Sequence, residues 1–365
     1  RSRLHSYFSF QTVKHLLIFL LVTVSSLACQ VPVFRYALER WQPDPFRLQL
    51  IYQGETPAEL TVTPKHLNLE FESLNMDKLT PNERFAIVGL EKLTKYPAFL
   101  LHPPESWKSN EPLVFPGTRS ALESILDSPL RNRIKKDLLN GESTVWVLIE
   151  GTDQTANDAT FNLLNDTLRK ASKSIKIPKG VIQANQIGKV GEDIDLDDIL
   201  RSSIPLKISF KIERIKSSDP AEESYLRILT ADRNSPPEEP LVVPIFGRGR
   251  TPGPLLGSSI TAEAVTTACE YLCGACSCQV KSGNPGYDLL FKANWQEKLQ
   301  SGLVVIDKSL PTILPSFNDE SLPAQESPVE KSSLKSYGVS FPKTLLLAIP
   351  LILVIGTIFL LKKSN

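Results

Sequence analysis

The chain has 365 residues, of which 41% are hydrophobic and 22% charged, with 41 basic and 40 acidic side chains. This is an ordinary globular composition, which excludes collagen-like, coiled-coil and largely disordered proteins. The three basic residues in 1–28 and the three in 342–365 have no acidic neighbours in those segments. Removing these six from the 41 leaves 35 basic against 40 acidic residues, so the middle of the chain has no electrostatic reason to bind nucleic acid.

Residues 1–28 have the layout of a secretory signal peptide. A basic flank precedes the apolar run 16–24, and the small-residue pattern Ser26-Leu27-Ala28 follows it. Nine apolar residues are too few to span about 30 Å of hydrocarbon. We therefore expect cleavage after Ala28, leaving Cys29 at the new N-terminus. The layout resembles that of bacterial lipoproteins, and this resemblance implies Cys29 as a candidate for lipidation.

The first half of the folded region, residues 29–141, is predicted to alternate helices and strands. Residues 46–52 alternate apolar and polar side chains, which is typical of a strand, and Gly141 is a natural end for a helix. The expected elements, in chain order, are a helix at 31–41, a strand at 46–52, a second strand within 60–71 indicated by Leu67, Leu69 and Phe71, a helix at 82–93, a strand at 96–101, and a helical stretch at 120–140 broken near Pro129.

The second half, residues 142–309, repeats this order of elements. The continuous apolar run 144–150 is typical of a buried strand. The expected elements then continue with a helix at 156–171, a strand at 206–215, a short helix at 220–229, a strand at 241–246 whose Pro244 indicates an edge or a bulge, a solvent-exposed turn at 247–250, and a helix at 261–273. This alternation predicts a layered α/β architecture in both halves.

The C-terminal part is predicted to be a stalk and a membrane anchor. Residues 310–343 are rich in Ser, Pro and Glu, which favours an extended, disordered stalk. The eighteen residues 344–361 carry no charge and span about 27 Å as a helix, enough to cross a bilayer. Lys362 and Lys363 place the tail, 362–365, in the cytoplasm. We therefore expect a single-pass protein of the cytoplasmic membrane with most of its chain in the periplasm, where other envelope proteins are candidate partners.

Two motifs resemble the thioredoxin superfamily. Cys29-Gln30-Val31-Pro32 heads a predicted helix, and Tyr96-Pro97 opens an apolar strand. In that superfamily a cysteine at a helix start lies beside a strand led by a proline that is usually cis. The resemblance implies two thioredoxin-like α/β domains, 29–141 and 142–309. Pro32 occupies the place of the family's second cysteine, which implies a binding or structural derivative rather than dithiol exchange at Cys29.

Four of the five cysteines fall within ten residues, Cys269, Cys273, Cys276 and Cys278. Cys269 and Cys273 are one helical turn apart and share a face. Gly274 is expected to end this helix in a left-handed conformation. The chain would then turn back, which predicts that all four sulfurs lie within a few ångströms of one another.

Three interpretations of this cluster remain open. In an oxidising compartment the four cysteines favour structural disulfides, with three pairings possible. Cys273, Cys276 and Cys278 would instead serve a thiol–disulfide oxidoreductase, because a Cys276–Cys278 bond would close a small, strained and reducible ring. Four thiolates from Cys269, Cys273, Cys276 and Cys278 would also suit Cu(I) or Zn²⁺.

The remaining residues offer little catalytic chemistry. Outside residues 1–28 the histidines are His66 and His102, and neither has the spacing of a metal ligand or a catalytic triad. The sequence therefore favours a membrane-anchored binding or scaffolding protein without a cofactor. The alternatives are a thiol–disulfide oxidoreductase and a Cu(I)- or Zn-binding protein.

Overall fold

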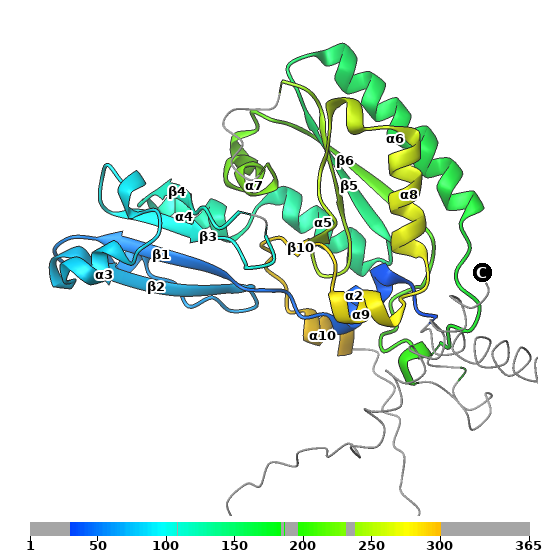
Figure 1. The fold of residues 1–365 in the computed structure, drawn as a ribbon, viewed down its shortest axis with the longest axis horizontal. Coiled ribbons are helices and arrows are strands. Elements are labelled where there is room, and N and C mark those ends of the chain that lie inside the picture. The colour runs from blue at the N-terminus through cyan, green and yellow to red at the C-terminus, as the bar shows by residue number, and fades with distance from the viewer. Residues whose placement is uncertain (1–29, 108, 184–185, 187–195, 231–237, 301–365) are drawn as a thin grey trace, which may run out of the picture. The chain divides into compact units, whose positions relative to one another are not determined.

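A computed structural model describes residues 30–107, 109–183, 186, 196–230 and 238–300 (Figure 1). The predicted signal peptide, Cys29, the stalk 310–343, the membrane helix 344–361 and the tail 362–365 lie outside these residues. Within the part described, no helix has both the length and the hydrophobicity needed to cross a bilayer. The described residues belong to one compact unit of the chain.

Two four-stranded sheets share the same topology. The first has the order β2-β1-β3-β4 and the second the order β6-β5-β7-β9. In each sheet the first two strands are parallel and the other neighbouring pairs are antiparallel. The strands are β1 (Phe46–Tyr52), β2 (Leu69–Asn75), β3 (Ala98–His102), β4 (Leu113–Pro116), β5 (Thr144–Glu150), β6 (Phe210–Lys216), β7 (Leu241–Ile245) and β9 (Leu255–Leu256). A separate two-stranded pair joins β8 (Arg250–Thr251) to β10 (Tyr287–Asp288).

Several helices begin at side chains that satisfy their otherwise unpaired N–H groups. Thr118, Ser128, Asp153 and Thr261 accept hydrogen bonds from the first turns of α4, α5, α6 and α8. The helices are α2 (Val33–Arg40), α3 (Pro81–Phe85), α4 (Arg119–Leu126), α5 (Pro129–Leu139), α6 (Gln154–Ser174), α7 (Glu223–Leu229), α8 (Ala262–Cys273), α9 (Cys278–Gly283) and α10 (Trp295–Gln300).

Helices cover both faces of the second sheet (Figure 1). On one face Trp146 and Leu148 pack against Leu164 of α6 and Val265 of α8. On the other face Val145, Val147 and Ile149 belong to a cluster that includes side chains of α5 and α7. Because both faces are buried, β5 is apolar throughout, as its sequence predicts.

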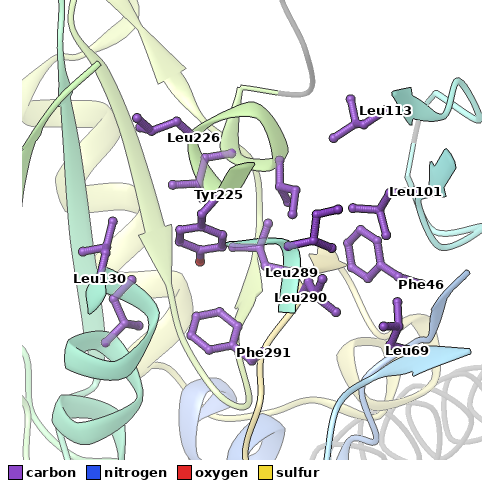
Figure 2. Close-up of a cluster of buried hydrophobic side chains, with 14 of the residues drawn as sticks. Phe46, Leu69, Leu101, Leu113, Leu130, Tyr225, Leu226, Leu289, Leu290 and Phe291 are labelled. Atoms are coloured by element: carbon purple, nitrogen blue, oxygen red, sulfur yellow. The ribbon is translucent and has the colours of Figure 1, made fainter. Parts of the chain in front are cut away.

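The two sheets share one hydrophobic cluster (Figure 2). Phe46 and Leu101 from the first sheet lie in the same cluster as Tyr225 of α7. The segment 289–291 fills the space between them, and Phe291 meets Tyr225 edge-to-face with ring centroids 5.9 Å apart. Other members drawn in Figure 2 are Leu69, Leu113, Leu130, Leu226, Leu289 and Leu290. The structure therefore confirms an α/β protein with two mixed four-stranded sheets.

Several predicted elements differ from the structure. The strand expected at 206–215 begins only at Phe210, and the helix expected at 82–93 is divided into α3 and a separate 3-10 turn, Leu90–Lys92. Pro244 lies on β7, which is not an edge strand because it runs between β5 and β9. β9 pairs with Leu241 and Val242 and does not extend to Pro244. The missing N–H of the proline therefore leaves no gap in the hydrogen bonds between β7 and β9.

Candidate functional site

The four clustered cysteines occupy three different environments. Cys269 is fully buried with the α6 and α8 side chains that cover the second sheet. Cys273 and Cys276, also fully buried, lie in a cluster with Phe34 of α2. Cys278 is exposed and begins α9, behind the N-cap residue Ser277.

The predicted gathering of all four sulfurs is therefore wrong, and Gly274 supplies the reason. This residue is extended, with φ −71° and ψ 166°, rather than left-handed. The chain leaves α8 as an extended segment and pairs with residues 31–33 instead of folding back over the helix. Within the described residues, no three His, Cys, Asp or Glu side chains form a group that could hold a metal ion.

Burial suppresses the ionisation of two of these thiols. It raises the pKa of Cys269 strongly, and the neighbouring Cys273 adds to that effect. Burial also raises the pKa of Cys273 to about 12, although a hydrogen bond with Ser143 acts in the opposite direction. Because the thiolate is the nucleophile, neither group is poised for thiol–disulfide exchange at neutral pH. The structure forms no disulfide among the four clustered cysteines.

The segment before α2 forms a short antiparallel ladder with the cysteine turn. The N–H of Val33 donates to the carbonyl of Gly274 at 3.0 Å, and the N–H of Cys276 donates to the carbonyl of Val31 at 2.9 Å. Pro32 lies opposite Ala275 between these two bonds. The N-terminal helix is therefore held against α8 and α9, in the second half of the chain.

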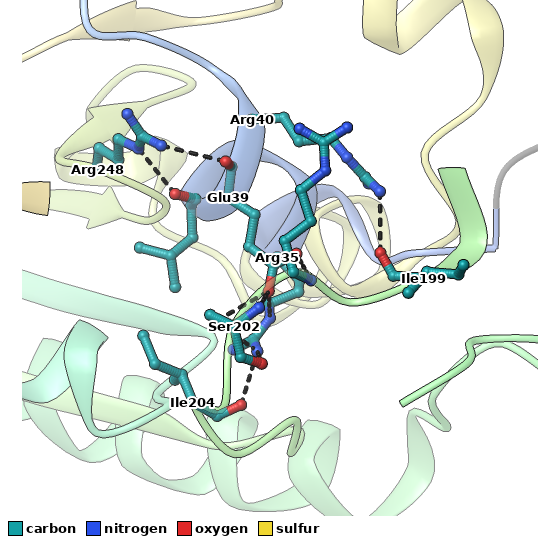
Figure 3. Close-up of polar contacts among 9 residues, drawn as sticks. Arg35, Glu39, Arg40, Ile199, Ser202, Ile204 and Arg248 are labelled. Atoms are coloured by element: carbon teal, nitrogen blue, oxygen red, sulfur yellow. Dashed lines mark hydrogen bonds and ion pairs between the residues drawn. The ribbon is translucent and has the colours of Figure 1, made fainter. Parts of the chain in front are cut away.

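A buried polar network fixes α2 in this position (Figure 3). Arg35 pairs with Glu39 at 2.8 Å, and both side chains have 0% exposure. Arg35 Nη2 donates to the carbonyl of Ile204 at 2.7 Å and to that of Ser202 at 3.1 Å. The Glu39 carboxylate accepts from the N–H groups of Arg201 and Ser202 at 2.7 and 3.0 Å.

The predicted solvent-exposed turn at 247–250 is buried. Arg248 Nε donates to the carbonyl of Leu38 at 2.8 Å and Nη2 to that of Glu39 at 3.1 Å, so its guanidinium caps the last turn of α2 (Figure 3). Arg250 is paired with Asp288 at 2.5 Å and donates to main-chain carbonyls in 284–286. The prediction is wrong because the guanidinium groups of these arginines donate hydrogen bonds to buried carbonyl and carboxylate oxygens, which allows both side chains to lie in the interior.

An open groove of about 1190 Å³ lies beside α8. Trp107 and Tyr287 meet in it with ring centroids 4.9 Å apart, and Tyr271 of α8 is 40% exposed. The Trp107 Nε1–H donates to the carbonyl of Asp288 at 2.9 Å, which fixes the indole. Among the described residues that line the groove, Glu263 is the one with a formal charge. The lining also includes Pro252, Pro254, Thr261, Ala264 and Thr267. Sequence reasoning missed this site because its lining comes from separate segments.

The two motifs of the thioredoxin resemblance lie in different places. The Tyr96–Pro97 peptide bond is cis and directly precedes β3. The helix of the other motif, α2, packs against α8, where Phe34 and Ala37 share a cluster with Leu272. His102, at the end of β3, is buried and bonds Gln49 Oε1 through Nε2 at 2.8 Å, a structural role within the sheet.

Comparisons with known proteins add little to these observations. No protein-family model matches the sequence, and no curated protein matches it. Among solved structures, the crystal structure of full-length ERdj5 aligns with 70% of this chain at 10% sequence identity and a TM-score of 0.18. The chain spans about a third of that protein's length, since the alignment covers 34% of it. A similarity this low carries no argument about fold or activity.

Proposed function

We propose that this protein is a membrane-anchored, extracytoplasmic binding protein that takes an extended polypeptide into the groove beside α8. Its two sheets would be thioredoxin-like domains that act as a scaffold rather than as a catalyst. The repeated strand order, with one parallel pair followed by antiparallel neighbours, supports this view of both domains. The predicted signal peptide and membrane helix support the location.

The groove is the observation that carries the proposal. Its volume of about 1190 Å³ exceeds the roughly 300–1,000 Å³ typical of a site for one small molecule. Aromatic rings and prolines line it, a composition that recurs where extended, proline-containing segments are recognised. The hydroxyls of Thr261 and Thr267 supply donors and acceptors for a peptide backbone. A single charge, Glu263, favours a ligand recognised by shape and backbone rather than by its own charge.

The oxidoreductase and metal-binding alternatives have no comparable support. Thiol–disulfide exchange needs accessible thiolates, whereas Cys269, Cys273 and Cys276 are fully buried. For metal binding, the described residues contain no group of three His, Cys, Asp or Glu side chains that could hold an ion. Burial also keeps the pKa of Cys269 and Cys273 far above neutrality. The binding function is therefore the one that the described residues support best.

A pair of alanine-to-tryptophan variants on α8 tests the groove. Ala264 lines it, whereas Ala262 lies two residues earlier, is exposed and does not line it. An indole at position 264 would fill the groove, and the same indole at position 262 would point about 200° away around the helix. We expect Ala264→Trp to weaken binding at least tenfold and Ala262→Trp to leave it unchanged.

The ligands for this test come from the full chain applied to an array of 15-residue peptides with and without proline. Affinities of the retained peptides are then measured by fluorescence anisotropy for both variants, after thermal unfolding has shown that both are folded. Equal affinity of Ala264→Trp and wild type, or retention of no peptide at all, would contradict the proposal.

A further inference from the structure

The outer edge of β7 forms main-chain hydrogen bonds on both sides of Pro244. On this edge the carbonyl of Pro240 accepts from the N–H of Gly257 at 3.0 Å. Farther along the chain, Phe246 and Arg250 exchange two N–H···O bonds of 2.9 Å each. Alternate residues of a strand direct their main-chain groups to the same edge. Pro244 therefore also directs its carbonyl to this edge, away from β5.

The segment 251–254 forms a bulge opposite this carbonyl. The pairs that flank the interruption in the ladder are Val242–Leu255 and Phe246–Arg250. Between these pairs, three residues on the β7 side oppose the four residues 251–254. An extra residue on one strand is a β-bulge, which disrupts the hydrogen bonds of the ladder locally.

This bulge supplies no donor to Pro244. Pro252 and Pro254 have no N–H. The N–H between them, that of Gly253, donates to Thr251 Oγ1 at 3.2 Å. Gly253 has φ +129°, a conformation that glycine adopts far more readily than other residues. Within the described residues, the Pro244 carbonyl therefore has no donor on its own ladder.

The interruption lies in the wall of the groove beside α8. Pro244 and the bulge residues 252–254 both line the groove. The indole N–H of Trp107, another lining residue, is already bonded to the carbonyl of Asp288. Pro244 is a buried residue, and a buried carbonyl costs free energy unless it accepts a hydrogen bond. A ligand in the groove can supply that donor.

From the direction of the carbonyl, the bulge without a donor and their place in the groove, we propose that the Pro244 carbonyl accepts a main-chain N–H of the bound polypeptide. The ligand continues the interrupted ladder at this one point. It therefore needs a residue other than proline there, whereas prolines are accommodated at its other positions. This inference rests on the proposed peptide-binding function and adds the contact that sets the register of the ligand.

A backbone ester scan of one 15-residue peptide retained in the array test examines this contact. In each member of the series an ester replaces one amide, which removes one N–H and leaves every side chain unchanged. Affinities for the full chain in detergent are measured by fluorescence anisotropy. We expect a loss of about fivefold or more at one position and of less than about twofold at the others, as for one hydrogen bond.

Photo-cross-linking then locates the sensitive N–H in the groove. A photo-leucine at that ligand position keeps the N–H and should attach within 241–246 or 251–256, as mapped by fragmentation of the tryptic peptides. The matched control places photo-leucine four residues away in the ligand, where attachment should shift to other segments. The variant Pro244→Ala keeps the carbonyl, so the same ester position should remain sensitive in it.

The outcomes separate this inference from the peptide-binding function itself. If peptides bind and Ala264→Trp weakens them, but every ester binds like the parent amide, the function stands and the carbonyl is bonded to water only. Attachment of the sensitive position outside 241–246 and 251–256 likewise overturns the inference alone. Retention of no peptide overturns both. The scan and the cross-link use the wild-type chain, so a Pro244→Ala variant that fails to fold does not remove the test.

Discussion

Removing the charge of Arg35 is expected to release α2 from the rest of the protein. Arg35 and Glu39 form an ion pair in which both side chains are inaccessible to solvent. The substitution Arg35→Met keeps the length and apolar character of the side chain but removes the guanidinium. The Glu39 carboxylate would then remain buried, held by the N–H groups of Arg201 and Ser202 and by the Ser202 hydroxyl but without a countercharge.

The expected cost follows from that stranded charge. Removing one partner of a buried ion pair destabilises a protein by about 3–5 kcal/mol. Arg35 also loses its bonds to the carbonyls of Ser202 and Ile204, which leaves two acceptors unsatisfied. In the double variant Arg35→Met with Glu39→Gln the buried charge disappears together with its partner. We therefore expect the double variant to be more stable than Arg35→Met alone, by about 1–3 kcal/mol.

Hydrogen exchange measured by mass spectrometry on the full chain can separate local release of α2 from global unfolding. A cost of 3–5 kcal/mol corresponds to a loss of protection of about 100-fold to 4,000-fold in residues 33–40 and 199–204, since a factor of ten equals about 1.4 kcal/mol. Urea unfolding followed by tryptophan fluorescence gives the global value. If Arg35→Met costs less than about 1 kcal/mol, or if the two single substitutions add without coupling, the argument from a buried countercharge is refuted.

Two further variants and one labelling experiment test other parts of the structure. Tyr225→Phe should raise the free energy of unfolding by about 1 kcal/mol, because the buried Tyr225 hydroxyl has no hydrogen-bond partner among the described residues. The phenylalanine ring would keep its contact with the Arg131 guanidinium, which lies 4.9 Å from the ring centroid. A loss of stability in thermal unfolding would show that the hydroxyl has a partner. In timed maleimide labelling at pH 8, Cys273 should react only after denaturation, because burial raises its pKa to about 12; rapid native labelling would contradict its burial. Burial, reinforced by Arg47, lowers the pKa of His102 from 6.5 to about 4, so its contribution to stability is complete above pH 6.5 and is lost as the pH falls toward 4. His102→Gln should flatten urea-unfolding stability over that interval, and an unchanged pH profile would count against this.

Strands with their own local pattern could be predicted from the sequence. β1 and β5 have the bounds that alternation and a continuous apolar run predict. β4 and β9 were missed because four and two residues are too few to show a period, and prolines adjoin both. Their place is decided by pairing with β3 and β7, which no local pattern encodes.

The candidate site was less predictable because its geometry depends on distant partners. A glycine after a helix indicates a left-handed end, but Gly274 is extended because its carbonyl pairs with Val33, far away in the sequence. Arg248 was expected in solvent because the sequence around it contains no acidic partner. Its hydrogen-bond acceptors are the main-chain carbonyls of Leu38 and Glu39, and the availability of a main-chain carbonyl does not depend on residue type. The groove could not be predicted for the same reason, since Trp107, Tyr271 and Tyr287 come from three segments that meet only in the folded protein.

Dividing the chain at the predicted domain boundary, after Gly141, should prevent the first half from folding alone. Its sheet buries Phe46, Leu69, Leu101 and Leu113 in a cluster that also contains Tyr225 and Phe291 from the second half. Each large apolar side chain that loses its cover costs about 1.5–3 kcal/mol, so uncovering four of them removes about 6–12 kcal/mol. That is as much as the whole stability of a typical domain, about 5–15 kcal/mol. We expect residues 30–141 to bind a hydrophobic dye and to unfold without a cooperative transition. A sharp thermal transition in this fragment would instead show that the shared cluster is an interface between two independent domains.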